Sequence, residues 1–244
     1  MTVMIGRSEN MKLSGIFKWG LVACVGLAGG LSAGIQSVSA GELQISGYSG
    51  YIASPHSHVD SSDGTTNYSN SVGWDGKPFE MPPFYGVRVT YWTDRWENWG
   101  GAIDFAHAKV YADLSGGAGG VYDTLEFTDG LNLLTANLMY RYANETRFTP
   151  YAGIGAGVAI PHVEVEFDAT ADSTFEYQIT GPSVQALVGV DIAITEHVST
   201  FLEYKANYSW NDADLAGGGS LETNILSNQF IVGLSYKFHN VLSY

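Results

Sequence analysis

The sequence predicts an all-β protein, namely one transmembrane antiparallel up-and-down β-barrel of about eight strands in residues 41–244, behind a cleaved signal peptide. Three observations predict it. Apolar and polar residues alternate with a period of two in eight segments, short and long connections alternate between these segments, and residues 1–40 have the pattern of an export signal.

The first 40 residues read as a signal peptide rather than as part of the fold. Lys12 and Lys18 flank the start of an apolar stretch, 19–31, and small residues follow up to Ala40. A charged region, an apolar region and a small-residue cleavage site are typical of secretory signals. The apolar run is shorter than the roughly 20 residues that a membrane-spanning helix needs. Met11 could be the true start of translation.

Charge and cysteine content narrow the class of protein further. The chain of 244 residues has a size compatible with one domain, and 11 Lys and Arg face 25 Asp and Glu, a net charge of -14. This balance argues against a nucleic-acid partner, which would favour a basic face. The single cysteine, Cys24, lies in the predicted signal peptide, so we expect no disulfide in the mature protein. A lipoprotein cleavage before Cys24 is disfavoured because Lys18 leaves little apolar chain ahead of it.

Alternation marks the strands in order along the chain. In 228–238 the bulky apolar residues Phe230, Val232, Leu234 and Tyr236 occupy one face, and the other face includes small and charged residues. No stretch of the mature chain has sustained helical periodicity. The predicted strands are about 42–54, 84–93, 99–111, 131–142, 148–161, 182–194, 199–210 and 228–238. Each has about ten residues or more, enough to cross a membrane as a tilted strand.

The connections favour a membrane barrel over a soluble sandwich. Three are short, at 94–98, 143–147 and 195–198, and four are long loops, at about 55–83, 112–130, 162–181 and 211–227. Long and short connections alternate strictly, as short periplasmic turns and long extracellular loops do in outer-membrane barrels. We therefore expect an outer-membrane location, with both termini in the periplasm and the long loops outside.

The two faces of the predicted strands carry different side chains. Aromatic residues rim the apolar face, as they do at membrane interfaces. The other face carries seven charged residues: Arg88, Asp104, Arg141, Asp191, Glu203, Lys205 and Lys237. A barrel of about eight strands has an interior filled by side chains, so we interpret these charges as a structural network in the lumen. This interpretation disfavours a channel.

Four histidines fall at the outer end of the predicted barrel. His56 and His58 enter the first long loop, His107 lies near the outer end of the third strand, and His162 begins the third long loop. His56, His107 and His162 could converge above the lumen and bind a divalent or transition metal. Their spacing matches no known ligand motif, and isolated histidines in wet loops are often mere surface residues.

Carboxylates in the same loops complete the candidate site. Glu80 and Asp129 are the candidate catalytic carboxylates beside the histidines. Tryptophan, proline and aspartate in the long loops indicate ordered, packed loops, which fit either a ligand site or a seal over the barrel mouth.

A hydrolase is the third possibility that the residues leave open. Small outer-membrane barrels that deacylate or acylate lipid A use Ser, His and an acid near the outer leaflet. The serines available here are Ser57, Ser115 and Ser220, with His56, His58 or His107 and with Asp214 or Glu222. None of the serines stands in a G-x-S-x-G context, so the sequence alone does not assemble such a trio.

At five segments the chain resembles the outer-membrane lipid A oxidases, a family of small barrels in some Gram-negative bacteria. The segments are 54–57, 73–85, 125–132, 161–163 and 211–224. The resemblance implies an oxygen-dependent oxidoreductase that converts the proximal glucosamine of lipid A to 2-aminogluconate and releases hydrogen peroxide. Oxidation by O2 usually needs a metal or an organic cofactor, which strengthens the metal interpretation of the three histidines.

The expected partners follow from this reading. They are the outer-membrane lipid, lipid A or lipopolysaccharide, and the barrel assembly machinery, and we expect a monomer. The competing interpretation is a non-enzymatic barrel that stabilises the envelope or serves adhesion or binding, since one fold hosts many functions.

Overall fold

The computed structural model describes residues 41–93, 95–115, 117–170 and 172–239, without the side chains of residues 117, 128 and 129. The predicted signal peptide, 1–40, lies outside these residues. The strands are β1 (Glu42–Ser62), β2 (Asn67–Asp75), β3 (Tyr85–Trp92), β4 (Trp99–Asp113), β5 (Tyr122–Arg141), β6 (Phe148–Phe167), β7 (Ser173–Tyr177), β8 (Gly181–Ala193), β9 (Val198–Leu215) and β10 (Gly219–Phe238). Two short 3-10 turns, η1 (Gly117–Gly120) and η2 (Ala216–Gly218), lie between strands. Within the described residues, no helix has the length and apolar character needed to cross a membrane.

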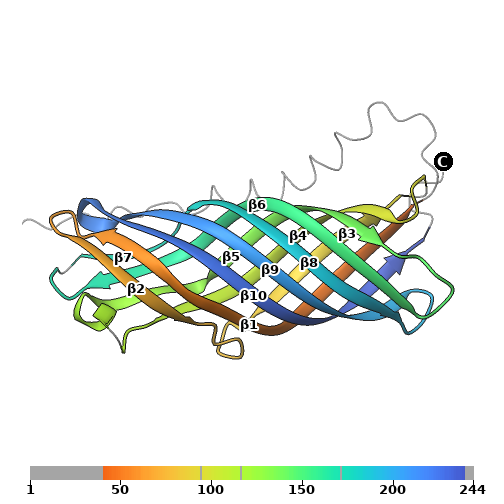
Figure 1. The fold of residues 1–244 in the computed structure, drawn as a ribbon, viewed down its shortest axis with the longest axis horizontal. Coiled ribbons are helices and arrows are strands. Elements are labelled where there is room, and N and C mark those ends of the chain that lie inside the picture. Colours follow the sequence, from red (N-terminus) through yellow and green to blue (C-terminus); the bar gives the residue numbers. More distant parts are fainter. Residues whose placement is uncertain (1–40, 94, 116, 171, 240–244) are drawn as a thin grey trace, which may run out of the picture. The chain divides into compact units, whose positions relative to one another are not determined.

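The strands form one antiparallel sheet that closes on itself, because β10 pairs with β1 (Figure 1). β2 and β3 follow one another at the same position between β1 and β4, and β7 and β8 do so beside β6. The sheet of ten strand segments is therefore a ring of 8 strands, which confirms the predicted barrel.

The first residue of β1 and the last residue of β10 lie at the same end of the barrel. We call the half of the barrel at this end the proximal half, and the other half the distal half. The proximal half comprises 42–53, 85–107, 131–161, 181–210 and 226–238, and the distal half comprises 54–75, 108–127, 162–177 and 211–225.

The proximal half follows the predicted pattern closely. Its side chains alternate between a buried inner face and an exposed outer face, and the outer face is apolar. Leu202, Leu234 and Ile154 are each more than half exposed on it. Because large apolar side chains exposed all around a barrel suit lipid and not water, this half has the surface of a membrane-spanning wall.

The distal half corrects the prediction of four long loops. The chain there continues as paired strands, and the actual turns are short, at 63–66, 114–121, 168–172 and 216–218. In β9, for example, residues 211–215 pair with 219–223 of β10 in unbroken register. The prediction was wrong because polar outward residues were taken for loop composition, although a strand with water on one face has the same composition.

One place in the distal ring is closed by side chains instead of a strand ladder. Neither β7 nor the distal part of β9 pairs with the other. The amide of Gln178 donates to the carbonyl of Asp214 at 2.7 Å and accepts the N–H of Asp214 at 3.0 Å. Thr174 accepts the N–H of Ala216 at 2.9 Å. These bonds satisfy backbone groups that an open sheet edge would leave unpaired.

Candidate functional site

The lumen of the proximal half is closed by an ion network. Arg88 donates two hydrogen bonds of 2.6 Å to the two carboxylate oxygens of Glu203, and Asp104 accepts from Lys205 and from the hydroxyl of Tyr48. Two cations thus face two anions, and at most 5% of any of these residues is exposed. Paired in this way the charges are tolerated in the barrel, which confirms the interpretation of the inward charges as a structural network.

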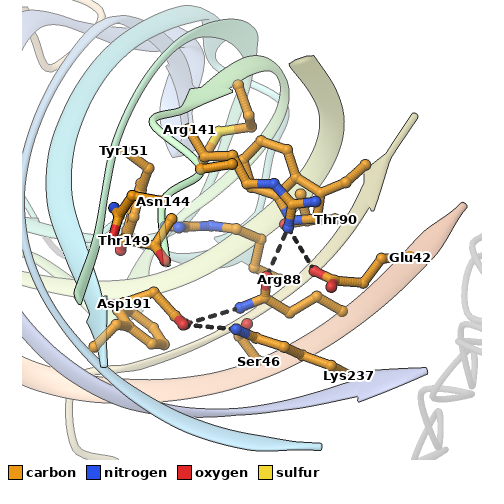
Figure 2. Close-up of a pocket in the computed structure, with 15 residues that line it drawn as sticks. Glu42, Ser46, Arg88, Thr90, Arg141, Asn144, Thr149, Tyr151, Asp191 and Lys237 are labelled. Atoms are coloured by element: carbon orange, nitrogen blue, oxygen red, sulfur yellow. Dashed lines mark hydrogen bonds and ion pairs between the residues drawn. The ribbon is translucent and has the colours of Figure 1, made fainter. Parts of the chain in front are cut away.

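A cavity of about 190 Å³ lies between this network and the proximal mouth (Figure 2). Arg141 binds Glu42 at 2.7 Å, and Lys237 binds Asp191 at 2.7 Å. Figure 2 shows these pairs lining the cavity together with Arg88. Because each of these cations already has a carboxylate partner, the cavity offers polar contacts to water or a small polar molecule but no strong anion site.

Large apolar side chains fill much of the distal lumen. Phe127 stacks on Trp74 at 6.1 Å between ring centroids, and Val59, Val163 and Leu221 are fully buried among them. The ion network and these apolar side chains fill the described lumen together with buried polar residues such as Asn211 and Thr223. The channel hypothesis is therefore disfavoured by packing as well as by strand number.

The three histidines predicted to converge above the lumen lie instead on the outer side of the wall. In β4 the even-numbered residues from Ala102 to Ala108 face the lumen, so His107 faces outward. Its Nδ1 lies 2.9 Å from Oδ1 of Asn132, and its ring stacks on Tyr85 at 4.9 Å. Only 5% of His107 is exposed, because these neighbours cover it.

His162 and His56 occupy other places on the same outer side. His162 in β6 packs edge-on against Phe175 at 4.3 Å and Tyr177 at 4.7 Å, both from β7. His56 in β1 is exposed and lies against Gly73 of β2. The histidines thus belong to β1, β4 and β6, on the wall of the barrel and not above its opening.

The two predicted carboxylates, Glu80 and Asp129, do not form a metal site with the histidines among the described side chains. Glu80 is exposed in the 76–84 loop, where its carboxylate lies 3.7 Å from the ammonium of Lys77. The side chain of Asp129 lies outside the described residues. Among the described residues, no three His, Cys, Asp or Glu side chains come together in a way that could hold a metal ion. The described side chains therefore do not assemble a protein-bound metal site.

A serine, a histidine and an aspartate do meet on the outer surface, but without the geometry of a catalytic triad. The hydroxyl of Ser69 lies 2.8 Å from Nε2 of His58 and donates to Asp60 at 2.7 Å. Asp60 lies 3.2 Å from the same Nε2 rather than orienting the ring from Nδ1. A triad needs the acid and the serine on opposite ring nitrogens. Ser57, the serine considered from the sequence, bonds to Trp74 and Thr223 instead.

A cluster of charged residues around Tyr111, which the sequence did not bring together, lies on the outward face just beyond the edge of the apolar belt. The register places Tyr111, Glu126 and Glu164 side by side on β4, β5 and β6. Lys77 and Lys109 lie over the Tyr111 ring, at 4.4 and 5.0 Å from its centroid. The alternation of β4 continues past His107, so Lys109, two residues further on, falls on the same face. This pattern in the sequence could have placed Lys109 in the cluster.

Partial burial shifts the pKa of Glu126 in this cluster, which lies in the distal half outside the apolar belt. Burial raises the pKa of the Glu126 carboxyl above its usual range, and the neighbouring carboxylate of Glu164 raises it further. The ammonium groups of Lys77 and Lys109 act in the opposite direction.

Comparisons with known proteins agree with this architecture. A model of the outer membrane protein beta-barrel domain matches residues 25–238. No curated protein matches the chain.

Several solved structures have a backbone similar to that of this chain. Neisserial surface protein A is 16% identical, with 83% of this chain and 100% of that chain covered and a TM-score of 0.47. The outer membrane protein AlkL, solved in lipid bilayers, is 17% identical, with 87% and 97% covered and a TM-score of 0.46. The N-terminal β-barrel domain of OprF from Pseudomonas aeruginosa is 11% identical, with 81% and 99% covered and a TM-score of 0.42.

Proposed function

Since the chain belongs to the outer membrane protein β-barrel family and lies in the outer membrane, we propose that it is a closed barrel that works on lipid A with its outer wall. The observation that carries the proposal is the position of the candidate residues. His107 and His162 lie on the outer side of the wall where the apolar belt ends, each covered by aromatic neighbours, and Glu80 is exposed in the loop at the same edge.

Orientation connects this edge with a particular lipid layer. Outer-membrane barrels extend further from the membrane on their extracellular side than on their periplasmic side, and here it is the distal strands that continue beyond the apolar belt. We therefore infer that the distal half lies outside the cell and the proximal end lies in the periplasm. The edge of the belt then lies at the headgroups of the outer leaflet, where the glucosamine units of lipid A are. The side chains that fill the lumen, including the paired charges of Arg88, Glu203, Asp104 and Lys205, support a function on the wall.

The specific reaction that we propose on lipid A is oxidation of the proximal glucosamine to 2-aminogluconate, with O2 as oxidant and hydrogen peroxide as product. The resemblance to the lipid A oxidases supports it, and the outward position of the candidate residues is compatible with it. The described side chains do not supply a metal centre, so the redox group would have to come from elsewhere.

Mass spectrometry of lipid A tests the proposal directly. The protein would be expressed in an outer membrane that lacks this modification, with and without air. A gain of one oxygen on the proximal sugar, seen only with protein and air, is the expected result. Loss of an acyl chain would identify a hydrolase instead, and unchanged lipid A beside folded protein would contradict any activity on it.

A second candidate is a non-enzymatic barrel that binds a partner at the cell surface. The observation that favours it is the distal half, a paired and tightly packed extension that presents Phe175, Tyr177 and Ile179 outward, each more than half exposed. Replacing Phe175 and Tyr177 by Ser would abolish binding of such a partner, and leave lipid A modification unchanged.

A further inference from the structure

One loop projects from the side of the barrel and not from one of its ends. Residues 76–84 connect β2 to β3, which occupy the same position between β1 and β4 in the distal and proximal halves. Figure 1 shows this connection projecting from the side of the barrel below the β1 label and not from either end. It therefore lies at the boundary between the two halves, where the apolar belt ends.

This loop is held in one conformation by several contacts. The N–H of Phe84 donates to the carbonyl of Pro78 at 2.9 Å, and the Phe84 side chain is fully buried. The ammonium of Lys109, itself fully buried, donates at 3.3 Å to the carbonyls of Glu80 and Met81. Lys109 thus fastens the tip of the loop to the outer side of β4.

The fastened tip presents two apolar side chains outward. Phe79 is 79% exposed and Met81 is 84% exposed, which are the largest exposures among the large hydrophobic residues described. Exposed apolar side chains mark a contact surface when they are contiguous with a larger apolar surface. The residue that follows the loop, Tyr85, begins the outward apolar row of β3 that continues with Val87.

We propose that Phe79 and Met81 insert into the acyl-chain layer of the outer leaflet and form a lateral anchor of the barrel. The proposal rests on the family and its membrane location, and does not depend on the activity toward lipid A. The continuity of the tip with the lipid-facing row of β3 identifies lipid as the occupant. Lys77 precedes the tip and Glu80 lies between its two apolar side chains. Their ion pair, at 3.7 Å, can remain at the headgroups, as polar residues beside interfacial anchors do.

Lys109 is the positioning residue in this arrangement. It makes no contact with lipid in the anchored state, but its bonds to the carbonyls of Glu80 and Met81 aim the two side chains away from the wall. Loss of these bonds would let the tip move without removing any apolar side chain.

Site-directed spin labelling measures the depth of the tip. Single cysteines, Phe79→Cys and Met81→Cys, would be made in full-length protein that also carries Cys24→Ser, and labelled with a nitroxide in dioleoylphosphatidylcholine vesicles. We expect each label to be relaxed more strongly by O2, which concentrates in the acyl layer, than by a water-soluble nickel chelate. The ratio should approach that of Val87→Cys, the matched lipid-facing control on β3.

Glu222→Cys on the outward face of distal β10 is the aqueous control. Labels at positions 79 and 81 that behave like the label at 222 would overturn the proposal, because the tip would then lie in water. All four substitutions replace exposed side chains, so folding is checked only as a precondition, by the heat-dependent gel mobility typical of folded barrels.

A second set of variants tests the role of Lys109. In Lys109→Met the label at position 81 should become more mobile and shallower, and Lys109→Arg should restore both readings. If the label at position 81 keeps its mobility and depth in a folded Lys109→Met variant, Lys109 does not position the tip. A shallow label in the unmodified background would remove the anchor itself.

Discussion

The two halves of the barrel use the same alternation with opposite chemistry. In proximal β10 the outward residues include Val232 and Leu234, and the inward residues include Ser235 and Gln229. In distal β10 the outward residues include Glu222, whereas the inward residues Leu221 and Ile225 are fully buried. The two faces exchange character within one unbroken strand.

β9 makes the same exchange at the same height. Proximal Leu202 and Tyr204 face outward and Lys205 faces the lumen, but distal Asp212 faces outward and Ala213 faces the lumen. The medium outside the wall explains the inversion, because lipid demands apolar side chains on the outside and water permits polar ones. The distal half is therefore built like a soluble β-protein and the proximal half like a membrane protein.

Removing an anion from the proximal network should have the largest effect. Glu203→Ala leaves Arg88 buried without its bidentate partner, and we expect the free energy of unfolding to fall by about 3–5 kcal/mol. Urea unfolding in lipid vesicles measures it. The matched control, Glu222→Ala on the outside of the distal half, should change stability by less than about 0.5 kcal/mol. Equal effects at the two glutamates would refute the assignment of the network as a buried structural element.

Truncating the distal core should weaken the distal half locally. Leu221→Ala creates a cavity among fully buried side chains and should cost about 2–5 kcal/mol. We expect limited proteolysis to cut the distal hairpins of this variant sooner, while the membrane-embedded strands stay protected. Cleavage that begins in the proximal half would argue against a local weakening of the distal half.

A charge on the outer face distinguishes the two media. Val232→Arg puts a cation on the lipid-facing side and should cost roughly 2–4 kcal/mol. Asn224→Arg makes the same change on the outer face of the same strand in the distal half, where water surrounds it, and should be nearly neutral. A comparable cost at both positions would mean that the lipid belt extends beyond the boundary described above.

Acidification should affect a distal turn and not the equivalent proximal one. Asp63 accepts the N–H groups of Thr65 and Thr66 at 2.8 and 2.7 Å, and these bonds lower the pKa of its carboxyl. Asn144, at a proximal turn, accepts the N–H of Thr146 at 2.8 Å without a titrating group.

The sign of the pH effect at Asp63 follows from the lowered pKa. Stability from the Asp63 bonds is present above the unfolded pKa and is lost as pH falls through the folded value. Amide proton shifts of Thr66 should therefore move at strongly acidic pH, while those of Thr146 stay constant. Shifts that move together in the two turns would show a global transition instead of a local one.

The proximal half was predictable from the sequence because lipid on the outside makes the alternation conspicuous. The row from Phe230 to Tyr236 has bulky apolar residues at every second position, and the turns between such rows are short. The distal half was read as loops because acidic and polar residues such as Asp212 and Glu222 dominate its outer face. The inward residues Ala213, Leu221 and Ile225 kept the period of two and could have revealed the strands.

The candidate site was only partly predictable. The sequence predicted His107 near the end of a strand and His162 at the start of a loop, with both converging above the lumen, but His162 lies within β6 and both residues lie on the outer side of the wall. Which side of the wall a residue faces depends on the register across each pair of strands, and a shift of one residue reverses it. The bulge between Glu126 and Leu131 in β5, for instance, has no clear signature in the sequence.

The sequence by itself determined the fold class and the membrane-facing wall, because these follow from local composition and from a period of two. The tertiary structure alone decided three further features: the paired distal half, the outward position of the histidines and the attachment of the 76–84 loop by Lys109. Each of these depends on contacts between strands far apart in the chain. Such contacts are set by register and by the closure of the sheet, which no local pattern encodes.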